Sequence, residues 1–221
     1  EMILEDHPRL LLFLPLAHVF ARYMQFFCFA GNVSLGLSSN LKTILADFKA
    51  FKPTFILAVP RIFEKIYNAA SQKAGAGFKG RVFADATQTA YDWSHAQQSG
   101  GSIPLALNAK HALYNKLLYS SIMEVFGGHV EYAVSGGAPL DSSIAHFFNG
   151  VGLPLLEGYG MTETCAPSSV NPTEGYKIGT IGLPLQGVTM GVDEEGELCI
   201  KSPAVCAGYH NNPCLLYTSP S

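Results

Sequence analysis

One short stretch of this sequence carries the residue types best suited to a polyphosphate ligand, the run GYGMTET that begins at Gly158. Its glycines, Gly158 and Gly160, let the backbone come close to a bound group, and the Tyr159 ring offers a flat face to a purine. The Thr162 hydroxyl can donate to a phosphate, and the Glu163 carboxylate supplies the hard oxygen that Mg²⁺ prefers. We therefore predict a nucleotide site here, and a Gly-rich turn without a ligand is the alternative.

The elements on either side of this run predict how it is positioned. The apolar segment from Leu153 to Leu156 predicts a buried strand that delivers a tight loop to the edge of a sheet. A second strand is predicted at 130–134, and the loop SGGAPL follows it at 135–140. A helix capped by Asp141 or Ser142 lies between the two strands. Because a strand, helix, strand order builds a parallel sheet, both loops are expected at its ligand-binding edge.

The chain before residue 130 alternates between apolar strands and amphipathic helices. A helix at 41–51 is expected to begin at a cap formed by Asn40 or the serine before it. In a long helix at 105–126, the residues expected to face the core are Leu113, Leu117, and Ile122 or Met123. The sequence thus predicts an α/β fold, a doubly wound, mostly parallel sheet with helices on both faces. Further strands are predicted at 10–14 and 54–59, and further helices at 19–29, 61–74 and 83–98.

The chain changes in texture after Thr164, where glycines become frequent and helical periodicity ends. The segments 188–192 and 197–201 are separated by a turn at 193–196, which predicts a hairpin. A small β-rich subdomain is therefore expected at this end of the chain.

We divide the chain into an α/β portion at 1–165 and a β-rich portion of the same domain at 166–213. Residues 214–221 fit neither portion and are expected to be a non-native tail. Because Met2 follows Glu1, the chain is expected to begin inside a longer protein.

The composition excludes several classes of function. With 221 residues, 48% of them hydrophobic, the chain can bury a substantial core. Only 14% of the residues are charged and the net charge is −3, which argues against nucleic acid as the partner because a basic face must displace counterions. The 5 cysteines form no C-x-x-C pair, so reduced thiols are expected. The apolar window from Leu10 to Gly31 contains His18 and Arg22 and follows no basic segment, so neither a membrane span nor a signal peptide is expected.

Three motifs together resemble the adenylate-forming superfamily of acyl-CoA synthetases, luciferases and peptide-synthetase adenylation domains. They are the run at Gly158, the loop at 135–140, and the run GELCI at 196–200 with Ala207-Gly208-Tyr209 after it. Two more segments, FLPLAHVFAR at 13–22 and AVPRIFEK at 58–65, resemble bacterial long-chain fatty acid CoA ligases. The resemblance covers nearly the whole chain.

The resemblance implies a role for each residue of the nucleotide site. Glu163 would bind the Mg²⁺ that bridges the phosphates, although a solvated loop carboxylate is the alternative for this residue. Thr162 would donate to the α-phosphate, and Tyr159 would lie against the adenine of ATP. The rest of the adenine slot would be formed by Gly137, Ala138, Glu157 and Gly158, and Gly160 would also belong to the nucleotide site.

The resemblance also implies that the fatty acid lies beside the segment that begins at His18. His18 would orient the acyl carboxylate during adenylation and thioester formation, and a helix cap is the alternative. The candidates for the wall of the acyl pocket are Val19, Phe20, Phe26 and Phe27, for which a plain core position is the alternative.

The activity that the resemblance implies is that of an ATP-dependent long-chain fatty acid CoA ligase, with ATP and Mg²⁺ as cofactors and CoA as cosubstrate. The enzyme would be cytoplasmic, and a peripheral contact with the inner membrane face is left open. The family's phosphate loop is expected before residue 1, and its ribose-binding Asp, hinge and catalytic Lys are expected after residue 213. The chain is therefore expected to be an internal fragment that is inactive alone.

Two other interpretations remain open. One is a ligase for another carboxylic acid, or an acyl-AMP ligase that passes its product to a carrier protein. The other is a non-catalytic module that binds a fatty acid or a nucleotide. Each assigns the same motifs to a product or role other than the formation of long-chain acyl-CoA.

Overall fold

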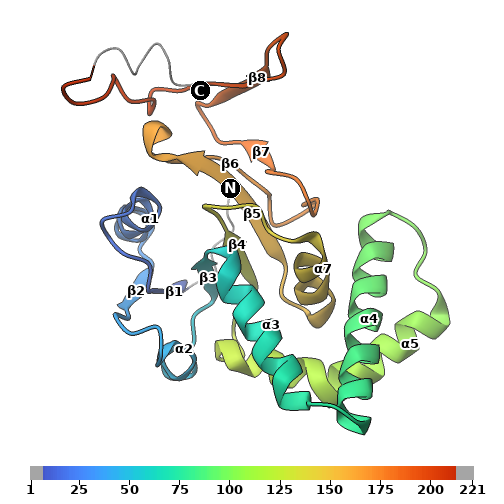
Figure 1. The fold of residues 1–221 in the computed structure, drawn as a ribbon. Helices are drawn as coiled ribbons and strands as arrows, with labels where there is room; N and C mark the ends of the chain where they lie inside the picture. The colour runs from blue at the N-terminus through green and yellow to red at the C-terminus, as the bar shows by residue number, and fades with distance from the viewer. Residues whose placement is uncertain (1–6, 213–221) are drawn as a thin grey trace.

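The computed structural model describes residues 7–212. A seven-stranded mixed sheet passes through the molecule (Figure 1). The first five strands in sheet order pair in parallel, and the last two join antiparallel. The mostly parallel α/β architecture predicted from the sequence is confirmed, whereas the tail at 214–221 lies outside the described residues. In sheet order the strands are β2 (Ser34–Leu37), β1 (Arg9–Leu12), β3 (Phe55–Ala58), β4 (Tyr132–Ser135), β5 (Leu155–Met161), β6 (Ala166–Val170) and β7 (Leu183–Pro184).

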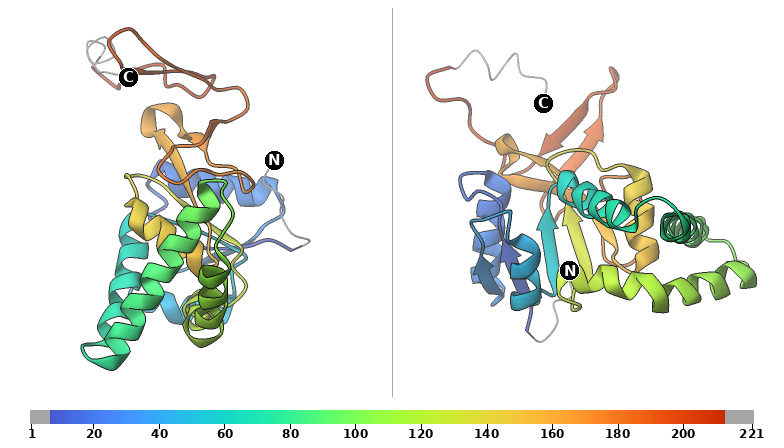
Figure 2. Two further views of the ribbon diagram at one scale, coloured as in Figure 1. Left: turned by 90° about the vertical axis from the view of Figure 1, so that its right-hand side faces the viewer. Right: turned by 60° about the horizontal axis from the view of Figure 1, so that its bottom comes forward.

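Helices cover both faces of this sheet, as Figures 1 and 2 show. Helix α1 (Val19–Ala30) packs on one face through Met24 and Cys28. The other face is covered by α2 (Ile44–Phe51), α3 (Pro60–Ala74), α4 (Phe78–Gln98) and α7 (Ser142–Val151). The helical run between α4 and β4 consists of α5 (Leu105–Tyr114), a π-helical turn (Asn115–Tyr119), α6 (Ser120–Met123) and a 3₁₀ turn (Glu124–Phe126).

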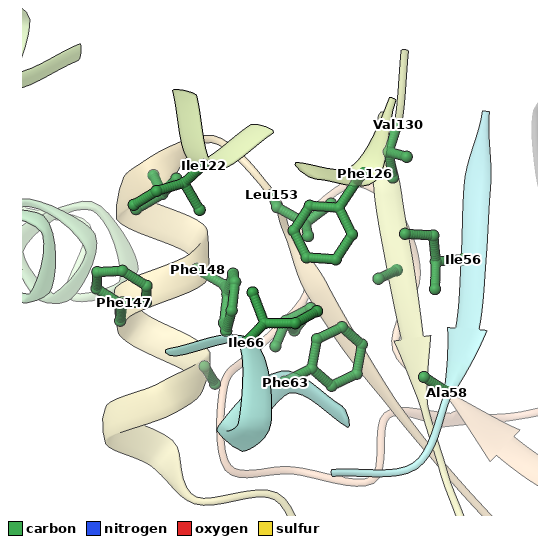
Figure 3. Packing of buried hydrophobic residues seen from close by; sticks show 14 of the residues in the cluster. Ile56, Ala58, Phe63, Ile66, Ile122, Phe126, Val130, Phe147, Phe148 and Leu153 are labelled. Atoms are coloured by element: carbon green, nitrogen blue, oxygen red, sulfur yellow. The ribbon is translucent and has the colours of Figure 1, made fainter. Parts of the chain in front are cut away.

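Alternation along the central strands divides the core into two layers. On β3, Phe55 and Leu57 join the cluster under α1, whereas Ile56 joins the larger cluster on the other face. In the larger cluster, Phe63 of α3 packs edge to face on Phe148 of α7, with ring centroids 5.7 Å apart (Figure 3). The two layers together fix β4 and β5, whose carboxyl ends carry the candidate site.

The prediction of a cap at Ser39 or Asn40 is wrong, because α2 begins at Ile44. The Asn40 side chain instead accepts a hydrogen bond from the N–H of Lys42 at 3.0 Å and so forms a turn before the helix. Strand β2, which precedes this turn, was not predicted. Its four residues, SLGL, are too short for a clear alternation and include a glycine.

The prediction that Leu113 and Leu117 face the core is also wrong, because their side chains are 55% and 65% exposed. A π-helical turn between α5 and α6 shifts the helical phase after residue 114. As a result Tyr119 and Phe126 face the core, and the prediction that Ile122 faces it is confirmed.

The predicted hairpin is confirmed as β8 (Thr189–Val192) paired antiparallel with β9 (Leu198–Lys201). It forms a second, two-stranded sheet that lies beyond β7 (Figure 2). The division of the chain at residue 165 stays a prediction, and β5 and β6 pair across it in one sheet. No helix among residues 7–212 is both long enough and apolar enough to cross a membrane.

Candidate functional site

A cavity of about 560 Å³ lies between α1, the carboxyl ends of β4 and β5, and the segments around β6 and β7. One of its walls is apolar and comes from α1 and the sheet. A second wall is formed by the Gly-rich ends of the strands, including Gly136, Gly137 and residues 158–162. The cavity therefore joins an apolar space to a backbone-lined edge.

Helix α1 supplies the apolar wall through residues spaced three or four apart. Val19, Phe20 and Phe27 line the cavity as predicted, together with Tyr23. The prediction for Phe26 is wrong, because its side chain is 62% exposed and lies outside the cavity. A helix turns about 100° per residue, which places Phe26 beyond the edge of the face of α1 that lines the cavity.

The floor of the cavity is formed by sheet residues that alternate toward α1. Phe55 and Leu57 of β3, Val134 of β4 and Leu156 of β5 all line it. The sequence did predict these strands but gave no sign of which face would carry the cavity.

Titratable groups packed in the same layer as this floor are kept neutral at physiological pH. Burial raises the pKa of the Cys28 thiol to about 11 and the pKa of the Tyr176 phenol to about 12. Tyr132 stacks on Phe55, with ring centroids 5.8 Å apart, and burial raises its pKa to about 12. This layer of the core therefore presents no charge from these groups to an apolar ligand.

The Gly-rich run is a continuation of β5, which corrects the prediction of a tight loop at Gly158. The strand pairs antiparallel with β6, with an irregularity in register between Tyr159 and Gly160. A Cβ atom at Gly160 would lie only 2.0 Å from the carbonyl oxygen of Ala166. Glycine is thus required here by the close approach of two strands as well as by any ligand.

A strained turn follows the strand. Residues Thr162–Thr164 form one 3₁₀ turn, and Thr162 is exposed on the cavity. The buried Thr164 hydroxyl accepts a hydrogen bond from the Met161 N–H at 3.2 Å and so closes the turn. Cys165 and Ala166 then adopt φ values of 55° and 93°, in the left-handed region that side chains rarely occupy. Such strain often accompanies functional sites, where the surrounding structure must hold it.

Glu163 lies in this turn, half-buried, and does not line the cavity itself. The Tyr209 hydroxyl donates to its Oε1 at 2.9 Å, and the Cys206 N–H donates to its carbonyl oxygen at 2.7 Å. Among residues 7–212 no group of three or more His, Cys, Asp or Glu side chains could hold a metal ion. A single carboxylate fits Mg²⁺ when the nucleotide supplies phosphate oxygens, which is how this ion is usually bound beside phosphates.

Glu157 ties two loops together. Its carboxylate accepts hydrogen bonds from the backbone N–H of Gly179 at 3.1 Å and from that of Leu140 at 3.4 Å. Neither Glu157 nor Ala138 lines the cavity, whereas Gly137, with a φ of 84°, does. The role predicted for each of these residues in an adenine slot stays a prediction.

His18 occupies the N-cap position of α1, but its side chain makes no capping hydrogen bond. It is exposed and lines the cavity close to the start of the apolar wall. The structure thus brings His18 to one cavity with Gly137, Gly158, Tyr159, Gly160 and Thr162, whereas Ala138, Glu157 and Glu163 are not among the residues that line it.

Sequence reasoning missed one whole wall of the cavity. It is formed by Asn171, Pro172 and Thr173 after β6, and by residues 183–186 around β7. The Asn171 side chain donates to the Thr180 carbonyl at 2.6 Å, which holds this loop against itself. This wall reaches the site through the antiparallel pairing of β5 with β6 and of β6 with β7. No local pattern in the sequence predicts that pairing.

The sequence is similar to those of a known enzyme family. The sequence model of the AMP-binding enzyme family matches residues 1–210. Long-chain-fatty-acid–CoA ligase FadD15 of Mycobacterium bovis is 44% identical over 210 residues, which cover 95% of this chain and 35% of that relative. Long chain acyl-CoA synthetase 3 of Arabidopsis thaliana is 32% identical over 214 residues, which cover 90% of this chain and 31% of that relative. The chain thus spans about a third of the length of these relatives.

Solved structures share the fold. The N-terminal domain of FACL13 from Mycobacterium tuberculosis matches 96% of this chain and 45% of its own, with a TM-score of 0.63 and 19% identity. The o-succinylbenzoate CoA synthetase MenE of Bacillus subtilis, solved in complex with ATP and magnesium ion, matches 95% of this chain and 36% of its own, with a TM-score of 0.59 and 18% identity. At these identities the likeness shows the fold alone.

Proposed function

Because this chain belongs to the AMP-binding enzyme family, we propose that it forms part of an enzyme that activates a long-chain fatty acid with ATP and passes it to CoA. The relatives from Mycobacterium and Arabidopsis are named a long-chain-fatty-acid–CoA ligase and a long chain acyl-CoA synthetase, and the first is 44% identical to the chain. The chain spans about a third of their length, so the complete activity belongs to a longer protein that contains it.

The observation that carries the proposal is the junction of two walls of the cavity. An apolar wall made by Val19, Phe20 and Phe27 meets the backbone edge at Gly158 to Thr162 within one cavity of about 560 Å³. A fatty acid needs the first wall for its chain, and a nucleotide phosphate needs the second. Burial of the chain contributes about 0.8 kcal/mol per methylene, offset in part by ordering of the chain.

At the polar end the chain's own residues hold the reacting groups. Thr162 donates to the α-phosphate, Tyr159 lies against the adenine, and His18 orients the acyl carboxylate. When bound, Mg²⁺ beside Glu163 neutralises phosphate charge. The carboxylate oxygen attacks the α-phosphorus and pyrophosphate leaves. The thiol of CoA then loses its proton to solvent, its sulfur attacks the acyl carbon, and AMP leaves. Holding the two anions together is the main task of such a site.

We further propose that the enzyme works in the cytoplasm, where ATP and CoA are available, with a peripheral contact at the inner membrane face as one route to its substrate. Membrane flotation of the full-length protein with vesicles that contain oleate tests that contact. Protein that stays at the bottom of the gradient would argue against it.

The test is pyrophosphate release and acyl-CoA formation by the full-length protein, with acids of graded length from octanoate to stearate. The proposal expects both products and the highest kcat/KM with the long acids. Pyrophosphate without thioester would favour an acyl-AMP ligase, and activity confined to short or aromatic acids would favour another acid. Binding of ATP or fatty acid without either product would favour a non-catalytic module and contradict the proposal.

A further inference from the structure

We propose that Tyr209 positions the carboxylate of Glu163 toward the metal and the phosphates of the nucleotide, an inference that rests on the proposed function. Tyr209 lies 46 residues further along the chain, and its hydroxyl donates to Oε1 of Glu163 at 2.9 Å. Both residues are half-buried. A contact between such distant parts of the chain is set by the tertiary fold rather than by local chain geometry.

The segment that carries Tyr209 holds Glu163 at two points. Besides the contact with the side chain, the N–H of Cys206 donates to the carbonyl oxygen of Glu163 at 2.7 Å. The first bond fixes the direction of the carboxylate and the second fixes the backbone of the turn. Both bonds come from a stretch of four residues, so the turn and the segment are positioned as one unit.

The backbone of this segment is shaped to reach the turn. After β9 ends at Lys201, the chain passes back over the tip of β5 and β6 (Figure 1). Gly208 adopts a φ of 148°, a conformation that residues with a side chain rarely adopt, immediately before Tyr209. The glycine therefore permits the bend that aims the tyrosine at Glu163.

The chemistry of the contact fits a positioning role. A carboxylate has two oxygens, and the Tyr209 hydroxyl uses Oε1, so Oε2 keeps its lone pairs for a cation. Hydrogen bonds to the non-ligating oxygen fix the orientation of a ligating carboxylate, and loss of such a partner commonly weakens metal affinity 10- to 100-fold. The strained residues Cys165 and Ala166 follow directly, so this turn has little freedom to find another arrangement.

A purely structural clasp is the competing explanation. It would hold the segment after β9 on the sheet without affecting the carboxylate. That explanation expects a loss of stability in Tyr209 variants with no change in metal affinity, and this difference makes the two explanations separable.

The test compares Tyr209→Phe with the parent in the full-length protein. Mn²⁺ binding is measured by electron paramagnetic resonance with a non-hydrolysable ATP analogue present, and Mg²⁺ dependence is measured by pyrophosphate release. We expect Mn²⁺ affinity to fall about tenfold, with a matching rise in the Mg²⁺ concentration for half-maximal release and a kcat at saturating Mg²⁺ near that of the parent. Tyr67→Phe, which removes a hydroxyl from α3 on the opposite face of the sheet, is the matched control and should behave as the parent.

Two outcomes would overturn the inference. One is unchanged Mn²⁺ affinity in Tyr209→Phe with a lower thermal midpoint, which would leave only the clasp. The other is equal weakening in Tyr67→Phe. A third variant, Glu163→Gln, separates this inference from the proposed function. If Glu163→Gln keeps the parent's Mn²⁺ affinity, Glu163 does not bind the metal and the inference fails with that role. If Mn²⁺ affinity falls in Glu163→Gln but not in Tyr209→Phe, only the role of Tyr209 is removed.

Discussion

The carboxylate of Glu157 accepts a hydrogen bond from the backbone N–H of Gly179 at 3.1 Å, across 22 residues of sequence. The other oxygen accepts the N–H of Leu140 at 3.4 Å. One side chain on β5 thus joins the loop after β4 to the loop that follows β6. Because both loops border the cavity, the shape of the site depends on a residue that does not line it.

Replacement of Glu157 by Ala is expected to loosen both loops. Two backbone donors lose a charged acceptor, which costs about 1–3 kcal/mol of stability. The KM for ATP should rise while a residual kcat remains. Glu157→Gln, which keeps one acceptor oxygen, should recover part of both effects. Urea unfolding and steady-state kinetics of the full-length protein measure them, and equal behaviour of the Ala variant and the parent would show that the two bonds do not matter.

The glycines of β5 are expected to differ in their tolerance of a methyl group. At Gly160 a Cβ would lie 2.0 Å from the carbonyl oxygen of Ala166, whereas at Gly158 the nearest atom is 3.4 Å away. Gly160→Ala should therefore cost about 1–3 kcal/mol and abolish activity, because the strands must separate. Gly158→Ala serves as the matched control and should cost less. The measurement is the thermal midpoint of unfolding, which should be lower for Gly160→Ala than for Gly158→Ala. The reverse order would contradict the register in which β5 pairs with β6.

A stabilising substitution is expected at Cys165, the first residue after the turn that carries Glu163. Cys165 is exposed and adopts a φ of 55°, which glycine and asparagine tolerate better than cysteine. Cys165→Gly should be neutral or stabilise the protein by up to about 1 kcal/mol. The β-branched variant Cys165→Val should destabilise it by a similar amount or more. Chemical unfolding compares the three proteins, and a Val variant as stable as the Gly variant would argue against strain at this position.

Much of the fold followed from the sequence, and the reasons for success and failure are physical. Buried parallel strands such as β3 and β4 are short unbroken apolar runs, so their positions could be predicted. The π-helical turn at Asn115–Tyr119 could not, because it changes the helical phase without a change in residue type. The missed edge strand β2 takes its structure from pairing with β1 rather than from its own sequence.

The candidate site divides in the same way. Residues whose type is required by the backbone or the ligand, such as Gly137, Gly160 and Thr162, were predicted and line the cavity. Phe26 was mistaken for a wall residue because an apolar helix gives no sequence signal for which face meets the cavity. The contact between Glu163 and Tyr209 could not be predicted, because it depends on a return of the chain after β9.

A buried histidine on the far face of the sheet predicts a pH dependence of stability. His146 Nδ1 lies 2.9 Å from the Ser94 hydroxyl, and the Tyr91 and His95 rings lie 4.9 and 5.6 Å from the His146 ring. Burial, and secondly the charge of His95, hold the pKa of His146 below its ordinary value of 6.5. Below about pH 6.5 the unfolded chain therefore binds more protons than the folded one. The free energy of unfolding then decreases as the pH is lowered, until the pKa of His146 in the folded protein is reached.

The measurement is the free energy of unfolding between about pH 7.5 and pH 5. His146→Gln should reduce the loss of stability below about pH 6.5, whatever its effect at neutral pH. The exposed His129→Gln is the surface control. An unchanged slope in the His146 variant would remove this residue as the cause.

The role of Glu163, whose turn after β5 is proposed to hold the nucleotide phosphates, is tested by a single substitution. Palmitate-dependent pyrophosphate release is assayed with ATP and Mg²⁺ for the full-length protein and its Glu163→Gln variant, with folding verified by circular dichroism. We expect Glu163→Gln to lower kcat/KM about 100-fold or more with the fold intact. Release at the parent's rate would contradict it, and with it the assignment of this turn to the active site.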